Sequence, residues 1–97
     1  MSNARGIAME HVALVLNVPP PWDLLTAKQL VYLSHILAGA SYLEIAAHYQ
    51  ISEAAVRMAM YRVGQMMQCR PRHVERMAAE DGVPKLPLPV ASDALRA

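Results

Sequence analysis

The side chains that most often perform catalysis or bind metals are few and scattered in this sequence. The four histidines are His11, His35, His48 and His73, and the single cysteine is Cys69. None of them has the close spacing that a metal site needs. The sequence also contains no glycine-rich phosphate loop and no motif for a nucleophilic serine. We therefore expect no enzyme activity, no metal and no cofactor, and we interpret Cys69 as structural.

Arginine side chains in the stretch 53–67 suggest nucleic-acid binding instead. Val56, Met60, Val63 and Met67 recur at helical spacing and define one buried face. The opposite face then carries uncharged side chains, with an arginine on each flank. A guanidinium group can bind both acceptors of guanine at once, which suits base recognition in the DNA major groove. The expected DNA-binding residues, two of which lie near helix N-termini, are Lys28, Ser52, Ala54, Arg57, Met58, Tyr61, Arg62 and Gln65.

These side chains suit different contacts. Arg57 is the first candidate for a base or phosphate contact, and Arg62 for a phosphate contact. Ala54 and Met58 suit a thymine methyl group, and Tyr61 suits stacking or a phosphate. Two alternatives stay open: the arginines are ordinary solvated charges, or the outward Met58 and Tyr61 mark a surface that binds a protein.

Two helices with a very short break between them are predicted for residues 41–67. Ser41 and Glu44 have the spacing of a capping box, which starts the first helix. Residues 50–51 interrupt the pattern, and Ser52 is a good N-cap for the second helix. A short capped helix, a tight turn and a longer helix are typical of a helix-turn-helix, whose second helix lies in the major groove.

A helix before this pair is predicted from complete start and stop signals. Thr26 and Gln29 form a second capping box, and Gly39 ends the helix. Its buried face is marked by Leu30, Leu33 and Leu37 and widened by Val31 and Ile36. This helix should pack across the following two.

A fourth helix is predicted over residues 71–81. Pro71 suits its first turn, and Gly82 ends it. Its arginines, Arg70, Arg72 and Arg76, share the segment with Glu75, Glu80 and Asp81, so a self-neutralised surface is expected. One apolar face is formed by Val74, Met77 and Ala78.

The two ends of the chain are expected to lie outside the core domain, 25–82. Residues 1–24 read as an N-terminal arm or short helix followed by a stiff proline-rich connector, with Trp22 as a core plug. Residues 83–97 read as a flexible proline-rich tail, either disordered or draped over the body. The expected fold is all-α: a compact four-helix helix-turn-helix domain with these two appendages.

Composition limits the possible classes of protein. The chain has 97 residues, 55% of them hydrophobic, which supports one small domain with its own core. No apolar run approaches the roughly 20 residues of a membrane span, and a secretory signal is not expected at the N-terminus. The single cysteine fits the reducing cytoplasm. A net charge of +1 is low for a nucleic-acid-binding domain.

The run 25–82 resembles the LuxR-type DNA-binding domain of bacterial transcription regulators. The matching features are Leu25-Thr26, the junction of Gly39 and Ser41, Glu44-Ile45-Ala46, Ile51-Ser52 and Val56-Arg57. The central part is also similar to region 4 of bacterial sigma factors. The family usually has Leu-Gly where this chain has Tyr49-Gln50, threonine at Ala55 and histidine at Ala59. The resemblance implies that the last helix makes a dimer contact, here through Val74, Met77 and Ala78.

The sequence therefore predicts a small cytoplasmic transcription regulator, bacterial or phage, that binds double-stranded DNA through the helix 53–67 as a homodimer. The alternative is a protein-interaction module on the same fold that binds another regulator or RNA polymerase. A scaffold or dimerisation element alone is a third reading.

Overall fold

The computed structural model describes residues 17–88 and contains four α-helices, with no strand in that range. A 3-10 turn, η1 (Trp22–Leu24), precedes α2 (Ala27–Leu37), α3 (Tyr42–Tyr49), α4 (Glu53–Met67) and α5 (Pro71–Glu80). The all-α prediction is confirmed, and so are the four helices. The predicted helix or arm before residue 17 lies outside the described residues. No helix in the described part of the chain is both long and apolar enough to span a bilayer.

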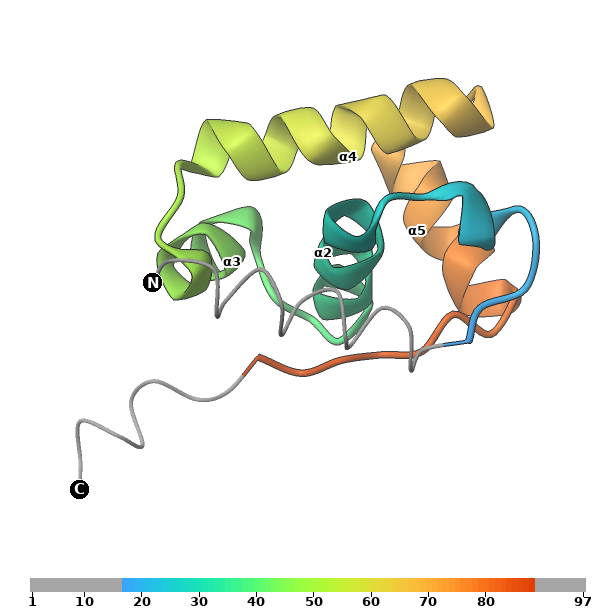
Figure 1. Ribbon diagram of the computed structural model, residues 1–97, viewed down its shortest axis with the longest axis horizontal. Coiled ribbons are helices and arrows are strands. Elements are labelled where there is room, and N and C mark those ends of the chain that lie inside the picture. Colours follow the sequence, from blue (N-terminus) through green and yellow to red (C-terminus); the bar gives the residue numbers. More distant parts are fainter. Residues whose placement is uncertain (1–16, 89–97) are drawn as a thin grey trace.

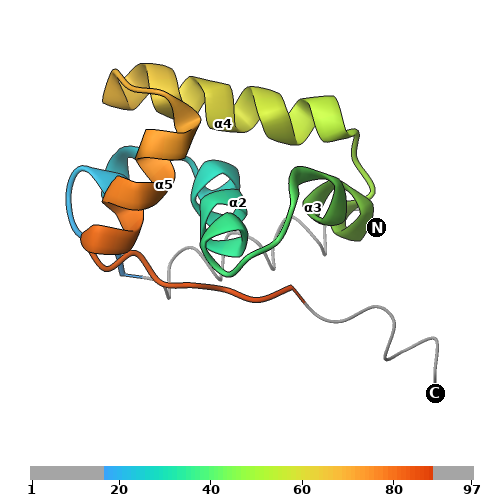
Figure 2. The same ribbon diagram turned by 180° about the vertical axis from the view of Figure 1, so that it is seen from behind.

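Helix α2 occupies the centre of the molecule, and α4 lies across it (Figure 1). Helices α3 and α5 flank α2 on opposite sides, as the reverse view also shows (Figure 2). Six consecutive residues of α2, 30–35, are buried because neighbours surround this helix. The predicted leucine stripe was therefore too narrow: Tyr32, Ser34 and His35 are buried as well, whereas Leu37 is only partly buried.

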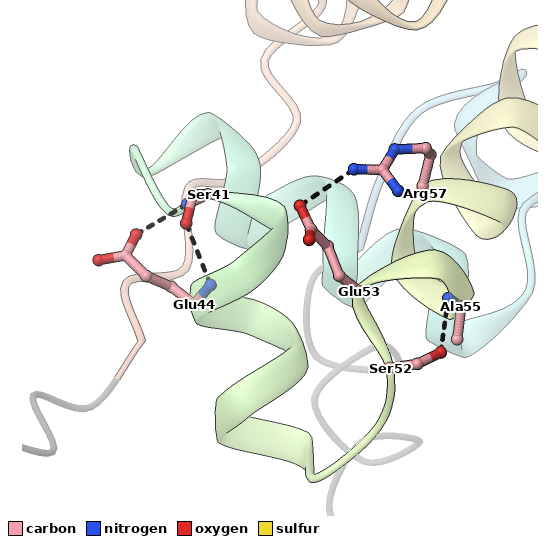
Figure 3. Close-up of polar contacts among 6 residues, drawn as sticks. All are labelled: Ser41, Glu44, Ser52, Glu53, Ala55 and Arg57. Carbon is pink, nitrogen blue, oxygen red and sulfur yellow. Dashed lines mark hydrogen bonds and ion pairs between the residues drawn. The ribbon is translucent and has the colours of Figure 1, made fainter.

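Local sequence explains where three of the helices start. Thr26 and Gln29 cap α2, and Ser41 and Glu44 cap α3, each pair exchanging both hydrogen bonds of the capping box. Ser52 begins α4 by accepting a hydrogen bond from the backbone N–H of Ala55, 3.0 Å away (Figure 3). These starting points agree with the sequence prediction.

The connection between α3 and α4 works without glycine. Gln50 ends α3 in the left-handed region, with a φ of 58°. The backbone N–H of Ile51 then bonds to the carbonyl oxygen of Ala46, which closes the last turn of α3. This turn holds α3 against α4, the two helices that the sequence singles out.

The apolar stripe of α5 belongs to the core of the protomer, which corrects the predicted dimer contact. Val74 and Ala78 have no exposed surface, and Met77 is half-buried with its sulfur 3.9 Å from the sulfur of Cys69. A second copy could touch Val74 or Ala78 only after the core had opened. The burial signal in the sequence was right, but the neighbour is α2 and α4 of the same chain.

Residues 83–88 run extended along the body beneath α2 (Figure 1). Val83 is buried, and Leu86 and Leu88 pack partly buried against the core. The backbone N–H of Leu86 donates to the carbonyl oxygen of Ser34 at 3.0 Å, and the Leu86 carbonyl accepts from His35. Of the two alternatives for the tail, disordered or draped over the body, these six residues follow the second. The rest of the predicted tail lies outside the described residues.

Both ring nitrogens of His35 make hydrogen bonds, and its burial lowers the pKa and so favours the neutral ring. The Leu86 carbonyl can only accept, so the Nδ1 atom of His35 carries the hydrogen. Nε2 then accepts from the hydroxyl of Tyr49, 2.6 Å away on α3. Burial lowers the pKa of His35, partly opposed by the Leu86 hydrogen bond and reinforced by the nearby His48.

This arrangement predicts a loss of stability in mild acid. Below the unfolded pKa of about 6.5, the unfolded chain binds a proton at His35 that the folded chain does not. The free energy of unfolding should therefore fall by up to about 1.4 kcal/mol per pH unit, from about pH 6.5 down to the folded pKa. Urea denaturation between pH 7 and 5 would measure it. His35→Gln, which keeps a donor and an acceptor, should flatten the slope, whereas His48→Gln, which removes only the smallest of the contributions to the pKa shift of His35, should keep most of it.

The buried hydroxyl of Ser34 has no hydrogen-bond partner in the described part of the chain. Because an unpaired buried polar group costs about 1–3 kcal/mol, Ser34→Ala should raise the free energy of unfolding by about 1 kcal/mol. Ser52→Ala, which removes a cap, should lower it by a similar amount. A loss of stability in Ser34→Ala would show that its hydroxyl is paired in solution.

Candidate nucleic-acid interface

The outer face of α4 is open to solvent and carries six of the eight predicted DNA-binding residues. The inner face is closed by the fully buried Val56, Met60 and Val63. On the outer side, Met58 is 47% exposed and Tyr61 53% exposed, although both are large and largely apolar. All six predicted residues on this helix are exposed: Ala54, Arg57, Met58, Tyr61, Arg62 and Gln65.

The remaining two predicted residues are placed differently. Lys28 is exposed in the first turn of α2, on another helix. Ser52 is exposed at the N-terminus of α4, but its oxygen already accepts the Ala55 N–H. Ser52 is thus first a helix cap, with its own O–H available for a phosphate.

Arg57 is held by two neighbours on the flank of α4. Its Nη2 lies 3.0 Å from Oε2 of Glu53, one helical turn earlier (Figure 3). The guanidinium carbon lies 5.8 Å from the centre of the Tyr42 ring on α3, within the range of a cation–π contact. The side chains of Arg57 and Glu53 are 58% and 43% exposed, so solvent weakens the pair. Arg57 is thus oriented by Glu53 and Tyr42, and only its Nη2 makes a hydrogen bond within the described chain.

Charged side chains on neighbouring helices influence the pKa of Tyr42. Burial raises its pKa; the negative charge of Glu75 on α5 adds to this, and the positive charge of Arg57 acts in the opposite direction. Burial also raises the pKa of Glu75, and Arg72 opposes that shift. Side chains of α3, α4 and α5 therefore influence one another electrostatically at this flank of α4.

The other arginines of the described chain make no ion pair there. Within residues 17–88, the pair of Arg57 and Glu53 is the single one present. The described part of α5 forms no direct ion pair, although the charge of Arg72 acts on the pKa of Glu75: Asp81 accepts from the indole of Trp22, and Arg76 donates to Nδ1 of His73 at 3.2 Å. The exposed and unpaired arginines are Arg62, Arg70, Arg72 and Arg76.

Two members of the site were missed by sequence reasoning. Glu53 is not among the expected site residues, although its spacing of four residues from Arg57 is the usual signal for a helical ion pair. Tyr42 lies 15 positions before Arg57, and no local pattern connects them. The contact between Tyr42 and Arg57 depends on how α3 packs against α4.

The described residues offer no metal site, since no group of three or more metal-binding side chains comes together among them. Comparison of the chain with protein-family models, curated proteins and solved structures gave no match.

Proposed function

We propose that this protein is a small DNA-binding transcription regulator, bacterial or phage and cytoplasmic, in which α3 and α4 form a helix-turn-helix. Helix α4 would lie in the major groove of double-stranded DNA. One observation carries the proposal: α4 buries one face completely and presents the other, with Arg57 and Arg62, to solvent. Because its inner face is fixed in the core, α4 can bind DNA through its outer face without a large loss of conformational entropy.

The succession of four helices and their caps supports the resemblance to LuxR-type domains. Capping at Ser41 and Ser52 sets the lengths of α3 and α4, and Gln50 makes the turn where the family usually has glycine. The unpaired arginines of α5 supply further positive charge for phosphates.

Affinity for DNA should be modest for one protomer. Over 25–67 the cations are Lys28, Arg57 and Arg62, against Glu44 and Glu53. A homodimer would raise the affinity by placing two copies of α4 on half-sites about one helical turn apart. Its contact surface must lie outside the buried stripe of α5.

A salt titration with random duplex DNA tests the proposal. Arg57→Ala should weaken binding by about 1–3 kcal/mol if the side chain contacts a base. Adding Arg62→Ala should also reduce the salt dependence, by a slope of about 1 for a lost phosphate contact. Thermal stability should hardly change, because both side chains are exposed.

Lys85→Ala is the matched control, since it removes an exposed positive charge from the extended segment after α5. It should bind like the wild type. Equal binding by wild type and the double variant would remove α4 from the DNA interface.

A protein-interaction module is the second candidate, and the exposed apolar side chains of α3 and α4 favour it. Leu43 is 63% exposed and Met66 45%, in addition to Met58 and Tyr61. Met and aromatic side chains are enriched in protein interfaces. No DNA binding at low salt, together with a partner such as RNA polymerase or another regulator lost in a Met58→Ser, Tyr61→Ser variant, would establish this function instead.

A further inference from the structure

Two oppositely charged side chains in the first two turns of α4 form an ion pair with each other. Glu53 is the first residue of the helix, and Arg57 lies one turn later. Their side chains meet at 3.0 Å with both groups open to solvent. In a helix that enters the major groove, residues near the N-terminus contact the base edges. The pair thus occupies the part of α4 from which bases are read.

Both partners keep hydrogen-bonding capacity beyond their mutual contact. A guanidinium has five N–H donors, and only Nη2 of Arg57 is used within the described chain. The Glu53 carboxylate accepts through Oε2, and its Oε1 makes no hydrogen bond to residues 17–88. The pair can therefore offer two parallel donors and an acceptor side by side.

A G·C base pair presents the complementary pattern in the major groove. Guanine shows the acceptors O6 and N7, which match a guanidinium, and cytosine shows the N4 amino donor, which matches a carboxylate. O6 and N4 are neighbours, because they share a Watson–Crick hydrogen bond. No other single base pair places a double acceptor and a donor in this order.

We propose that Glu53 and Arg57 act together as the specificity determinant of α4 and read one G·C base pair, with Arg57 on guanine and Glu53 on cytosine. This inference rests on the proposed DNA-binding function. Tyr42 is a positioning residue: its ring backs the guanidinium from α3 and limits the directions in which Arg57 can point.

The negative charge of Glu53 gives the pair a second effect. A carboxylate close to phosphates weakens binding to every sequence, and only a site with a donor at the right place compensates for it. Glu53 should therefore lower affinity for random DNA while it raises discrimination between sites. A side chain present only to support the helix would not change discrimination.

The test is selection of duplexes from a pool with a random core, followed by titration of the enriched duplex and of the same duplex with its G·C pair changed to A·T. We would compare wild type with Glu53→Ala and with Glu80→Ala. Glu80 is an exposed acid at the end of α5 without an ion pair in the described chain, so its removal changes the net charge equally.

Wild type should enrich a site containing G·C and prefer it over the changed duplex by at least about 5-fold, as one good base contact provides. Glu53→Ala should bind random DNA more tightly and lose the part of that preference that depends on cytosine, whereas Glu80→Ala should keep all of it. If wild type binds DNA but Glu53→Ala discriminates equally well, the inference is overturned and the proposed function stands. If no variant binds DNA at low salt, both are overturned.

Discussion

Trp22→Ala is expected to lower the free energy of unfolding by about 3–5 kcal/mol, the usual cost of emptying a buried aromatic site. The side chain has no exposed surface, and it lies in a turn before α2. Its indole N–H donates to Oδ2 of Asp81 at 2.7 Å, from the other end of the folded segment. Replacing the ring by a methyl group removes core contacts and this link together. Chemical denaturation measured by circular dichroism would give the value.

Two further variants separate packing from the hydrogen bond. Trp22→Phe keeps an aromatic ring and loses the N–H donor, so it should cost clearly less than Trp22→Ala. Asp81→Ala leaves the buried indole N–H without its acceptor and should cost about 1–3 kcal/mol. In the Trp22→Phe background, Asp81→Ala should cost almost nothing, because no donor is left to pair. Equal costs of Asp81→Ala in both backgrounds would contradict the link.

Gly64→Ala is expected to destabilise the protein by about 1–3 kcal/mol, although alanine is the better helix former. Gly64 is buried in α4. A Cβ atom there would lie 2.6 Å from the carbonyl oxygen of Cys69 and 3.5 Å from Cδ of Pro71. The backbone N–H of Cys69 donates to the Gly64 carbonyl at 2.9 Å, so the two backbones are already in contact. A carbonyl in the main chain cannot move aside as a flexible side chain can.

Whether Gly64→Ala lowers or raises the free energy of unfolding decides if a Cβ atom is tolerated at this position. At an ordinary helical position, changing glycine to alanine gains about 0.5–1 kcal/mol. Ala55→Gly, at an exposed site in the same helix, calibrates that propensity and should destabilise by a comparable amount. A Gly64→Ala variant more stable than the wild type would mean that the α4–α5 junction relaxes without loss.

Features encoded in neighbouring residues were predicted well. The capping boxes at Thr26 and Ser41 and the N-cap at Ser52 depend on residues three positions apart, so the starts of α2, α3 and α4 could be read directly. The burial of Trp22 and Val56 also followed from their type and spacing.

Features that depend on tertiary contacts could not be predicted. An apolar stripe predicts that a face is covered but not what covers it. The resemblance implied a dimer contact for Val74 and Ala78, and the stripe alone could not show that they pack inside the protomer. His35 was one of four scattered histidines until the fold placed Tyr49 and Leu86 beside its ring. The requirement for glycine at position 64 appears only where α4 meets Cys69.

The path of residues 83–88 changes where this domain should be considered to end. The helix-ending Gly82 suggests that the domain ends there. A chain cut at Gly82 would lose Leu86, whose carbonyl accepts a hydrogen bond from His35 and whose N–H donates to the carbonyl of Ser34. The buried imidazole would then need water, and the partly buried Leu86 and Leu88 would no longer cover the core. Any shortened or fused version meant to behave like the native protein must therefore extend at least to residue 88. A protease that cleaves between Val83 and Leu86 would loosen the centre of the helical core, not merely trim its edge.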